Sequence, residues 1–330
     1  MNRVFILGAG FSYHISGGRL PLMAQLGHEF KEQHTWTSSY FPEGSTASAN
    51  LESLLTRLDL DLQDERDSGR RELLEERASD IKIFLRRRLS LDGIEDAQIE
   101  KAKSLCSRLF ADGDTIINFN YDCLLEHILW KLNFWSPNGG YGQSPKLNDL
   151  SSYGSQIEKN PKGITILKPH SSLNFEEVKT DRDVYLQPWL TDRLFPGINA
   201  HWNEEAETPP IVLPSFVKIF GQNRTLMYIW HEAIEKIGNA DIIIMIGYSL
   251  PKSDAMARFL LSFICAREFK ARGIEKLRVG ILSKGSHARH GLDQIIDVGQ
   301  FGEDDIQPLV LDVANDADYE TLYIWSNAAR

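Results

Sequence analysis

The sequence predicts a doubly wound α/β fold, in which a mostly parallel sheet is covered by helices on both faces. The first observation is the opening apolar run Val4–Leu7, which leads directly into Gly8 and Gly10 and is typical of a buried strand that ends in a tight turn. The second is the alternation of apolar runs and helical patterns in the last third of the chain. A parallel sheet needs such helical connections, because its strands cannot be joined by hairpins.

The strands of this sheet are expected wherever a short apolar run is bounded by turn-forming residues. These runs are Val4–Leu7, Asp114–Phe119, Ile164–Leu167, Ile211–Leu213, Asp241–Ile246 and Leu277–Leu282. Helices are expected where apolar residues recur at helical spacing, namely after Pro21 and over Asp122–Leu132, Thr225–Ile237 and Asp254–Arg272. The stretch Phe134–Pro161 is rich in Gly, Ser, Asn and Pro and is expected to be a long loop.

A charged helical stretch interrupts this alternation between residues 47 and 111. Its leucines recur at helical spacing, as at Leu51, Leu54, Leu55 and Leu58, and it contains no strand-like run. We therefore expect a single domain over residues 1–330 with a helical subdomain inserted at 47–111.

The composition narrows the possible functions. The chain has 330 residues, of which 42% are hydrophobic and 25% charged, as in ordinary globular proteins. A net charge of -10 argues against direct binding of nucleic acid, which requires a basic surface. No stretch approaches the length of a membrane span, so we expect no membrane partner and a cytoplasmic location.

The cysteines argue against a metal centre. Cys106, Cys123 and Cys265 are far apart and none belongs to a C-x-x-C pair. This excludes a four-cysteine zinc site and argues against a disulfide framework, in agreement with a reducing compartment. We therefore expect no bound metal.

Polar residues follow four of the apolar runs, at the positions where a parallel sheet binds its ligands. In chain order, the four segments are Gly8-Ala9-Gly10-Phe11-Ser12, Asn118-Phe119-Asn120-Tyr121-Asp122, Lys168-Pro169-His170-Ser171-Ser172-Leu173-Asn174 and Gly247-Tyr248-Ser249-Leu250-Pro251-Lys252-Ser253-Asp254. The carboxyl ends of parallel strands lie at one edge of a sheet, so we expect these segments to face one crevice.

Each segment also has a purely structural interpretation. Glycines after a strand serve ordinary tight turns as well as phosphate binding. The third glycine of the dinucleotide fingerprint is replaced by Tyr13, which disfavours a dehydrogenase. Asn120 or Asp122 could cap the next helix, and His170 could be a structural histidine with satisfied hydrogen bonds.

Taken together, the order and content of the four segments resemble the sirtuin family, in particular its bacterial NAD-consuming, antiphage branch. The resemblance implies a Rossmann-like sheet. It rests on a Gly-Ala-Gly-x-Ser opening, an Asn-x-Asp segment, a histidine after a strand, and a Gly-x-Ser-Leu segment followed by Pro and Asp. The matching residues are Gly8, Ala9, Gly10 and Ser12, then Asn120 and Asp122, then His170, then Gly247, Ser249, Leu250, Pro251 and Asp254.

The resemblance implies that NAD+ is the substrate and that Asn120 and His170 are the catalytic residues. Asp122 would bind the nicotinamide carboxamide. The pyrophosphate would lie against the first segment, and the adenosine side against the last. The implied contacts are Gly8, Gly10 and Ser12 for the pyrophosphate, and Ser249 and Asp254 for the adenosine side. Ala9, Phe11 and Gly247 are implied to bind the cofactor as well.

Two departures from the family pattern matter. The zinc-ribbon cysteines of sirtuin deacylases are missing, which removes the small domain that helps to form an acyl-lysine groove. In addition, Ser171 replaces the glycine that usually follows the histidine. With no acyl-lysine groove, the acceptor would be water, which gives nicotinamide and ADP-ribose, or an adenine nitrogen of the same molecule, which gives a cyclic product. Of the two, hydrolysis is favoured.

The expected function is therefore an NAD+ glycohydrolase, which the resemblance implies to be a regulated effector of antiphage defence. Unregulated NAD+ loss would be toxic, so we expect an inhibited resting state that is released by formation of a homo-oligomer, by a ligand or by a partner defence protein. Two alternatives stay open. One is a non-catalytic module that senses NAD+ or ADP-ribose, and the other is a sirtuin-type deacylase or ADP-ribosyltransferase.

Overall fold

The fold is seen in a computed structural model of the chain. The structure describes residues 1–40, 51–144, 147–148, 150, 157–179, 184–188, 190–191, 194–197, 223–250, 254–262, 277–283, 306–311 and 315–327. The expected strand at 211–213, the second half of the helix expected at 254–272, and Cys265 lie outside these residues.

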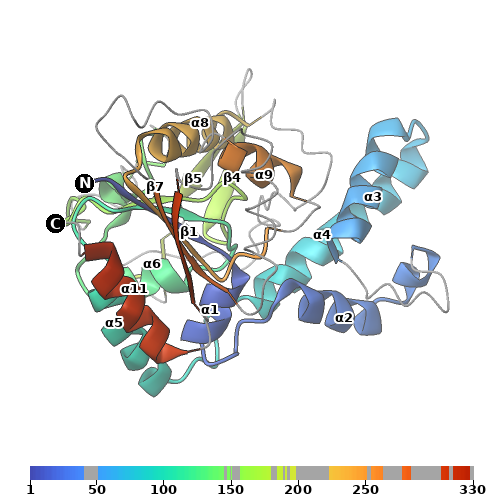
Figure 1. Cartoon of the computed structure of the whole chain (residues 1–330). Coiled ribbons are helices and arrows are strands. Elements are labelled where there is room, and N and C mark those ends of the chain that lie inside the picture. The colour runs from blue at the N-terminus through green and yellow to red at the C-terminus, as the bar shows by residue number, and fades with distance from the viewer. Residues whose placement is uncertain are drawn as a thin grey trace.

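A six-stranded sheet in the order β3-β2-β1-β6-β7-β8 forms the centre of the molecule (Figure 1). Every neighbouring pair in it is parallel. This is the strand order of a doubly wound dinucleotide-binding fold, so the Rossmann-like prediction is confirmed. The strands are β1 (Arg3–Leu7), β2 (Thr115–Asn118), β3 (Thr165–Leu167), β6 (Ile242–Ile246), β7 (Leu277–Leu282) and β8 (Ile306–Leu311).

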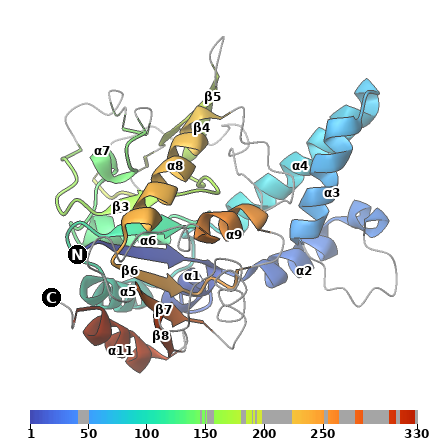
Figure 2. The same cartoon turned by 45° about the horizontal axis from the view of Figure 1, so that its top comes forward.

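Helices cover both faces of the sheet (Figures 1 and 2). One face carries α1 (Ala9–Ile15), α5 (Asp96–Leu109), α6 (Leu124–Lys131) and α11 (Asp316–Asn327). The other carries α8 (Arg224–Asn239) and α9 (Ala255–Ser262). None of the helices among the described residues is long and apolar enough to cross a membrane.

A small antiparallel hairpin and two short helical turns are further elements of the structure. The hairpin packs against α8, where the Thr225 side chain accepts a hydrogen bond from the amide of Leu186 (2.9 Å). The elements are β4 (Phe175–Lys179), β5 (Val184–Pro188), η1 (Thr35–Ser39) and α7 (Pro137–Gly140).

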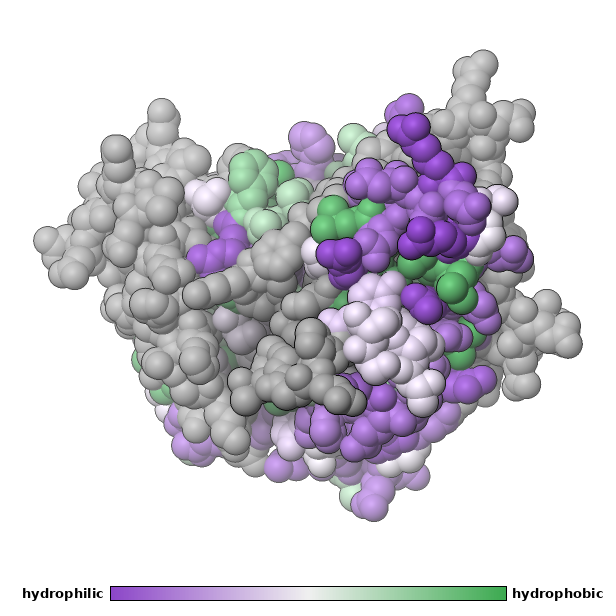
Figure 3. Space-filling model, turned by 90° about the vertical axis from the view of Figure 1, so that its right-hand side faces the viewer, coloured by the Kyte–Doolittle hydropathy of each residue, from purple (hydrophilic) through white to green (hydrophobic). Residues whose placement is uncertain are grey.

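Three helices form an arm that extends away from the sheet (Figures 1 and 2). They are α2 (Met23–Gln33), α3 (Leu51–Asp64) and α4 (Ser68–Arg88). The guanidinium of Arg88 on α4 binds the carboxylate of Glu29 on α2 (2.6 Å), which joins the two helices at the base of the arm. Figure 3 views the molecule from this side, and hydrophilic residues cover much of the described surface there.

The helix α5 lies within the range expected for the insertion, yet it packs against α1, α6 and α11 on the sheet. The projecting part of this range therefore consists of α3 and α4. The assignment of 47–111 as a separate insertion stays a prediction.

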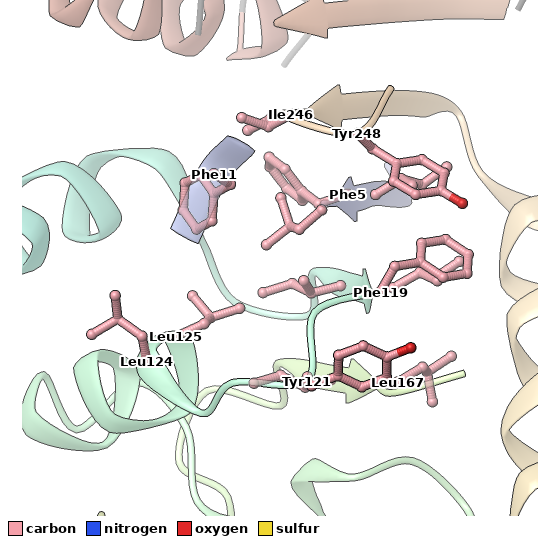
Figure 4. Packing of buried hydrophobic residues seen from close by; sticks show 14 of the residues in the cluster. Phe5, Phe11, Phe119, Tyr121, Leu124, Leu125, Leu167, Ile246 and Tyr248 are labelled. Atoms are coloured by element: carbon pink, nitrogen blue, oxygen red, sulfur yellow. The ribbon is translucent and has the colours of Figure 1, made fainter. Parts of the chain in front are cut away.

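The core lies along the two central strands. All five residues of β1 and all five of β6 are buried, because helices cover both of their faces. Strands buried on both sides are continuous apolar runs, and this is why they are recognisable in the sequence. Figure 4 shows the packing around Phe5 and Ile246 at the centre of this core.

The edge strand β8 and the hairpin β4–β5 are not predicted by the sequence patterns. β8 contains Pro308, which cannot donate a hydrogen bond to a neighbouring strand and so argues against a strand in the sequence. At the edge of the sheet this missing donor is tolerated, and β8 pairs with β7 alone among the described strands.

Candidate functional site

The four polar segments meet at the carboxyl edge of the sheet. In the observed strand order, β2 and β3 lie on one side of β1, and β6, β7 and β8 lie on the other side. The switch point of the fold therefore lies between β1 and β6, and doubly wound sheets bind ligands outside the strands at this point. Gly8 follows β1 and Gly247 follows β6 at this position.

The glycines at the switch point are required by the packing of two backbone turns. A Cβ on Gly10 would lie 2.8 Å from the Cα of Gly247, and a Cβ on Gly247 would lie 2.1 Å from the amide nitrogen of Phe11. Gly247 also has a φ of +63°, which favours glycine. The structural interpretation of these glycines is thus correct, and a role in phosphate binding would be additional to it.

The backbone amides of the first segment are partly occupied within the protein. Gly8 donates to the carbonyl of Ile246 (3.0 Å), Gly10 to that of Gly247 (2.9 Å), and Phe11 to that of Gly8 (2.9 Å). A pyrophosphate bound by these three amides would have to share or replace these hydrogen bonds.

Asn120 ties the end of β2 to the turn after β1. Its side-chain Nδ2 donates to the carbonyl of Gly8 (3.0 Å) and to the hydroxyl of Ser12 (2.9 Å). An asparagine amide has two protons to donate, so both are used here. Oδ1 is left as the atom through which Asn120 can accept a hydrogen bond from a ligand.

Asp122 lies one residue before Cys123, the N-cap of helix α6, and its side chain satisfies the first amide of this helix. Its Oδ1 accepts the amide of Leu124 (3.1 Å), and Ser12 also hydrogen-bonds its carboxyl group. Burial raises the pKa of Asp122, and the charge of Lys168 opposes this shift. Asn120, Ser12 and Asp122 thus form a continuous chain of hydrogen bonds beneath the turn after β1.

His170 lies in a tight turn after β3. The amide of Ser171 donates to the carbonyl of Lys168 (2.9 Å), and the indole of Trp230 donates to the carbonyl of Pro169 (3.1 Å). Ser171 has a φ of +69°, in the left-handed region that favours glycine. Glycine would adopt this backbone freely, whereas the serine keeps it at some cost in strain.

The ring of His170 is held by a carboxylate from the other half of the sheet. Its Nε2 lies 3.1 Å from Oδ2 of Asp254, at the start of α9. The same Oδ2 accepts the hydroxyl of Tyr248 (2.7 Å). The resemblance implies a place for Asp254 on the adenosine side, whereas its observed neighbours are a catalytic candidate and a tyrosine.

Aromatic rings surround His170. Phe119 contacts it edge-on with ring centroids 4.9 Å apart, and Tyr121 and Trp230 lie at 6.1 and 6.4 Å. Tyr248 stacks on Phe119 at 4.6 Å. Figure 4 shows Phe119, Tyr121 and Tyr248 together on one side of the packed residues.

A fully buried ion pair lies beneath the site. Nζ of Lys168 is 2.9 Å from Oε1 of Glu126 and 2.7 Å from the carbonyl of Asp122, and both side chains of the ion pair are fully buried. Burial raises the pKa of Glu126, although Lys168 opposes the shift. Burial also raises the pKa of the neighbouring Cys123 thiol to about 12, so this thiol is neutral.

The candidate residues differ in their accessibility. His170 and Asn120 are 4% and 6% exposed, and Phe11, Ser12, Asp122 and Asp254 are buried as well. Ser249 is exposed, and Ala9, Gly10 and Gly247 are half-buried. The accessible part of the predicted set is therefore the switch-point turn, and the catalytic candidates lie below the surface in this conformation.

Three contributors to this site cannot be recognised in the sequence, namely the His170–Asp254 contact, Tyr248 and the Lys168–Glu126 pair. Asp254 and Tyr248 both belong to the polar segments, but nothing in a sequence links them to His170. Within the described part of the chain, no group of three or more His, Cys, Asp or Glu side chains could hold a metal ion.

Neither protein-family models nor curated proteins match the chain. Among solved structures it is similar to a Sir2 homologue in complex with 2'-O-acetyl-ADP-ribose, with 13% identity over 91% of this chain and 92% of that one and a TM-score of 0.37. It is also similar to a Sir2 protein bound to a propionylated peptide, with 14% identity over 100% and 94% of the two chains and a TM-score of 0.34. Because similarity this low is no evidence of shared chemistry, it assigns no role to any residue of this chain.

Proposed function

We propose that this chain is an NAD+ glycohydrolase, which cleaves the bond between nicotinamide and ribose. The observation that carries the proposal is the meeting of the four motif segments at one edge of the sheet, around the switch point between β1 and β6. Doubly wound sheets of this strand order bind dinucleotides at that point. The resemblance of the motifs to NAD-consuming sirtuin-like proteins supplies the choice of ligand and reaction.

The chemistry requires a held ribose and a base. NAD+ and water give nicotinamide, ADP-ribose and one proton. Asn120 would accept a hydrogen bond from a ribose hydroxyl or from the attacking water through Oδ1, since its amide protons are donated to Gly8 and Ser12. His170 would accept the proton from the water as it attacks the ribose carbon.

The remaining residues would bind the rest of NAD+. The switch-point turn would contact the pyrophosphate, mainly through its accessible residues Ala9 and Gly10. Ser249, which is exposed, would contact the adenosine side. Asp122 is buried and its side chain already accepts the amide of Leu124, so a contact with the nicotinamide carboxamide would require this side chain to change partners.

We further propose that the enzyme is a regulated effector of antiphage defence, active in the cytoplasm as a homo-oligomer or with a partner defence protein. The burial of His170 and Asn120 supports an inhibited resting state, because substrate could reach these side chains only after a rearrangement. The insertion at 47–111 is a candidate for the surface that receives the signal.

The test is to incubate the purified chain with NAD+ over a range of protein concentrations and separate the products by chromatography. His170→Ala should reduce nicotinamide release by about 10²-fold or more, the usual contribution of a general base. His231→Ala removes an exposed histidine on α8 and serves as the matched control. Asn120→Ala is less informative, because it also breaks the links to Gly8 and Ser12.

Three other results would replace this proposal. Tight NAD+ binding without nicotinamide release at any protein concentration would favour the sensing module. Nicotinamide release only in the presence of an acylated peptide would favour a deacylase. Transfer of labelled ADP-ribose to protein would favour an ADP-ribosyltransferase.

A further inference from the structure

Asp254 is only 1% exposed, and its carboxylate oxygens lie against polar atoms of His170, Tyr248 and Ala257. Oδ2 lies 3.1 Å from Nε2 of His170 and accepts the hydroxyl of Tyr248 at 2.7 Å. Oδ1 accepts the amide of Ala257 at 3.2 Å and so caps α9. The carboxylate therefore joins the β3 turn, the β6 turn and a helix end.

We infer that Asp254 is a positioning residue that fixes the tautomer of His170 and makes Nδ1 the proton-accepting nitrogen. This inference rests on the proposed function and deepens it. A carboxylate can only accept hydrogen bonds, so the imidazole nitrogen facing Asp254 must carry a proton. In the neutral ring the lone pair is then on Nδ1, because the hydrogen bond at one nitrogen decides the state of the other.

The surroundings hold this arrangement rigidly. Tyr248 is fixed by stacking on Phe119, and the turn that carries it contains Gly247 and Leu250, both with positive φ. Leu250, at a φ of +52°, has a strained conformation that glycine would adopt freely. Strained backbone beside a hydrogen-bonded histidine and carboxylate is typical of a site in which side-chain placement matters.

A helix cap alone does not explain Asp254. Capping uses Oδ1, and asparagine caps helices as well as aspartate does. Asp254→Asn can therefore keep the cap through its amide oxygen while it presents an NH2 donor to His170. This donor would require a lone pair on Nε2 and would move the ring proton to Nδ1, the nitrogen that should accept.

The first experiment measures steady-state NAD+ cleavage by the full chain. Asp254→Asn should lower kcat by about 10²-fold, the upper end of the range for loss of a residue that orients a ligating histidine. The KM for NAD+ should stay within about 3-fold of the wild-type value. The double variant Asp254→Asn with His170→Ala should be no slower than His170→Ala alone, since both changes remove one function. Asp112→Asn, which removes a carboxylate that is 76% exposed near Lys162, is the matched control.

A structural role would give a different pattern. If Asp254 only stabilises the fold, the double variant would lose further activity and the melting temperature would fall in both backgrounds. Either that result or full activity in Asp254→Asn would overturn the inference.

The second experiment does not depend on catalysis. Nitrogen NMR of the protein labelled with nitrogen-15 histidine, with the His170 signals assigned from the His170→Ala spectrum, should show the Nε2–H tautomer in the wild type and the Nδ1–H tautomer in Asp254→Asn. A wild-type Nδ1–H tautomer would overturn the inference even if Asp254→Asn fails to fold. The expected tautomers together with an absence of nicotinamide release would refute the proposed function and leave the Asp254–His170 arrangement standing.

Discussion

Two buried ion pairs lie at opposite ends of the central sheet, and they are built differently. At the amino end, Arg3 binds both carboxylate oxygens of Asp114 at 2.9 and 2.6 Å and also contacts Ser326 and the carbonyl of Leu109. At the carboxyl end, Lys168 reaches Glu126 through one contact of 2.9 Å. Oε2 of Glu126 is buried and has no hydrogen-bond partner among the described residues.

This difference distinguishes an ion pair that only stabilises the fold, Arg3–Asp114, from one that lies beneath the candidate site, Lys168–Glu126. A bidentate pair with further hydrogen bonds offsets most of the cost of burying two charges, whereas an unsatisfied carboxylate oxygen costs free energy. Lys168 also holds the carbonyl of Asp122 and begins the turn of His170, so its position affects both halves of the candidate site. The ion pair that costs free energy thus lies at the carboxyl end, where the chemistry is proposed, and the well-satisfied ion pair lies at the amino end.

The largest effect is expected from Asp114→Ala. Removal of one partner leaves the guanidinium of Arg3 buried and unpaired, so the free energy of unfolding should fall by about 3–5 kcal/mol. The kcat of the folded fraction should not change, because Asp114 lies at the end of the sheet remote from His170. Urea unfolding followed by tryptophan fluorescence measures the first quantity, and nicotinamide release well below the transition measures the second. A large loss of kcat would contradict the division between the two ends.

Gly247 follows β6 at the carboxyl end of the sheet, and Gly113 precedes β2 at the amino end. Replacing each with alanine adds one methyl group and so compares the two ends. Gly113 has a φ of +80°, and no described atom lies within 4 Å of the position that a Cβ would take, so alanine there should cost only the left-handed penalty of about 1–2 kcal/mol. A Cβ on Gly247 would also lie 2.1 Å from the Phe11 amide nitrogen, and such overpacking adds about 1–3 kcal/mol. Thermal unfolding should therefore rank Gly247→Ala below Gly113→Ala, and NAD+ titration should show weaker binding for Gly247→Ala alone. Equal stabilities would mean that the two turns move apart freely.

Glu126→Gln should have a smaller effect on stability and a clear one on activity. The amide oxygen can still accept from Lys168, so we expect a loss of about 1–3 kcal/mol, the cost of an imperfectly satisfied buried group. Because Lys168 would then be free to shift, the Asp122 carbonyl and the His170 turn should move and kcat should fall. Glu100→Gln, which weakens an exposed pair with Lys103, is the control and should change stability by less than about 1 kcal/mol. An unchanged kcat in Glu126→Gln would make this pair purely structural, like the one at the amino end.

Buried strands can be predicted from the sequence, whereas the side-chain partners at the carboxyl end cannot. Continuous apolar runs reveal β1, β2, β3, β6 and β7, because buried strands of a parallel sheet have little polar alternation. Placing polar residues after these runs then brings Asn120 and His170 to one edge, since all parallel strands end on the same side. The pairing of His170 with Asp254, and of Lys168 with Glu126, depends on how α9 and α6 pack on the sheet. No local pattern records that packing, so these partners are visible only in three dimensions.

The smallest effect concerns the pH dependence of stability and arises at Glu232 on α8. Burial raises the pKa of Glu232, although the Gln143 amide hydrogen bond (2.7 Å) and Lys236 oppose the shift and Glu235 adds to it. A raised pKa means that the folded protein binds the proton more tightly than the unfolded chain does. The stabilisation is therefore complete below the unfolded pKa of about 4.3 and is lost as the pH rises through the folded value.

Glu232→Gln should remove this dependence while its amide oxygen still accepts from Gln143. The melting temperature of Glu232→Gln relative to the wild type should thus increase as the pH is raised from about 4 to 7, by an amount small beside the other changes. Asp122 and Glu126 have pKa values raised in the same direction, so their residual pH dependence should persist in the variant. A difference that is constant or decreases with pH would show that Glu232 is held by its hydrogen bond more than it is penalised by burial.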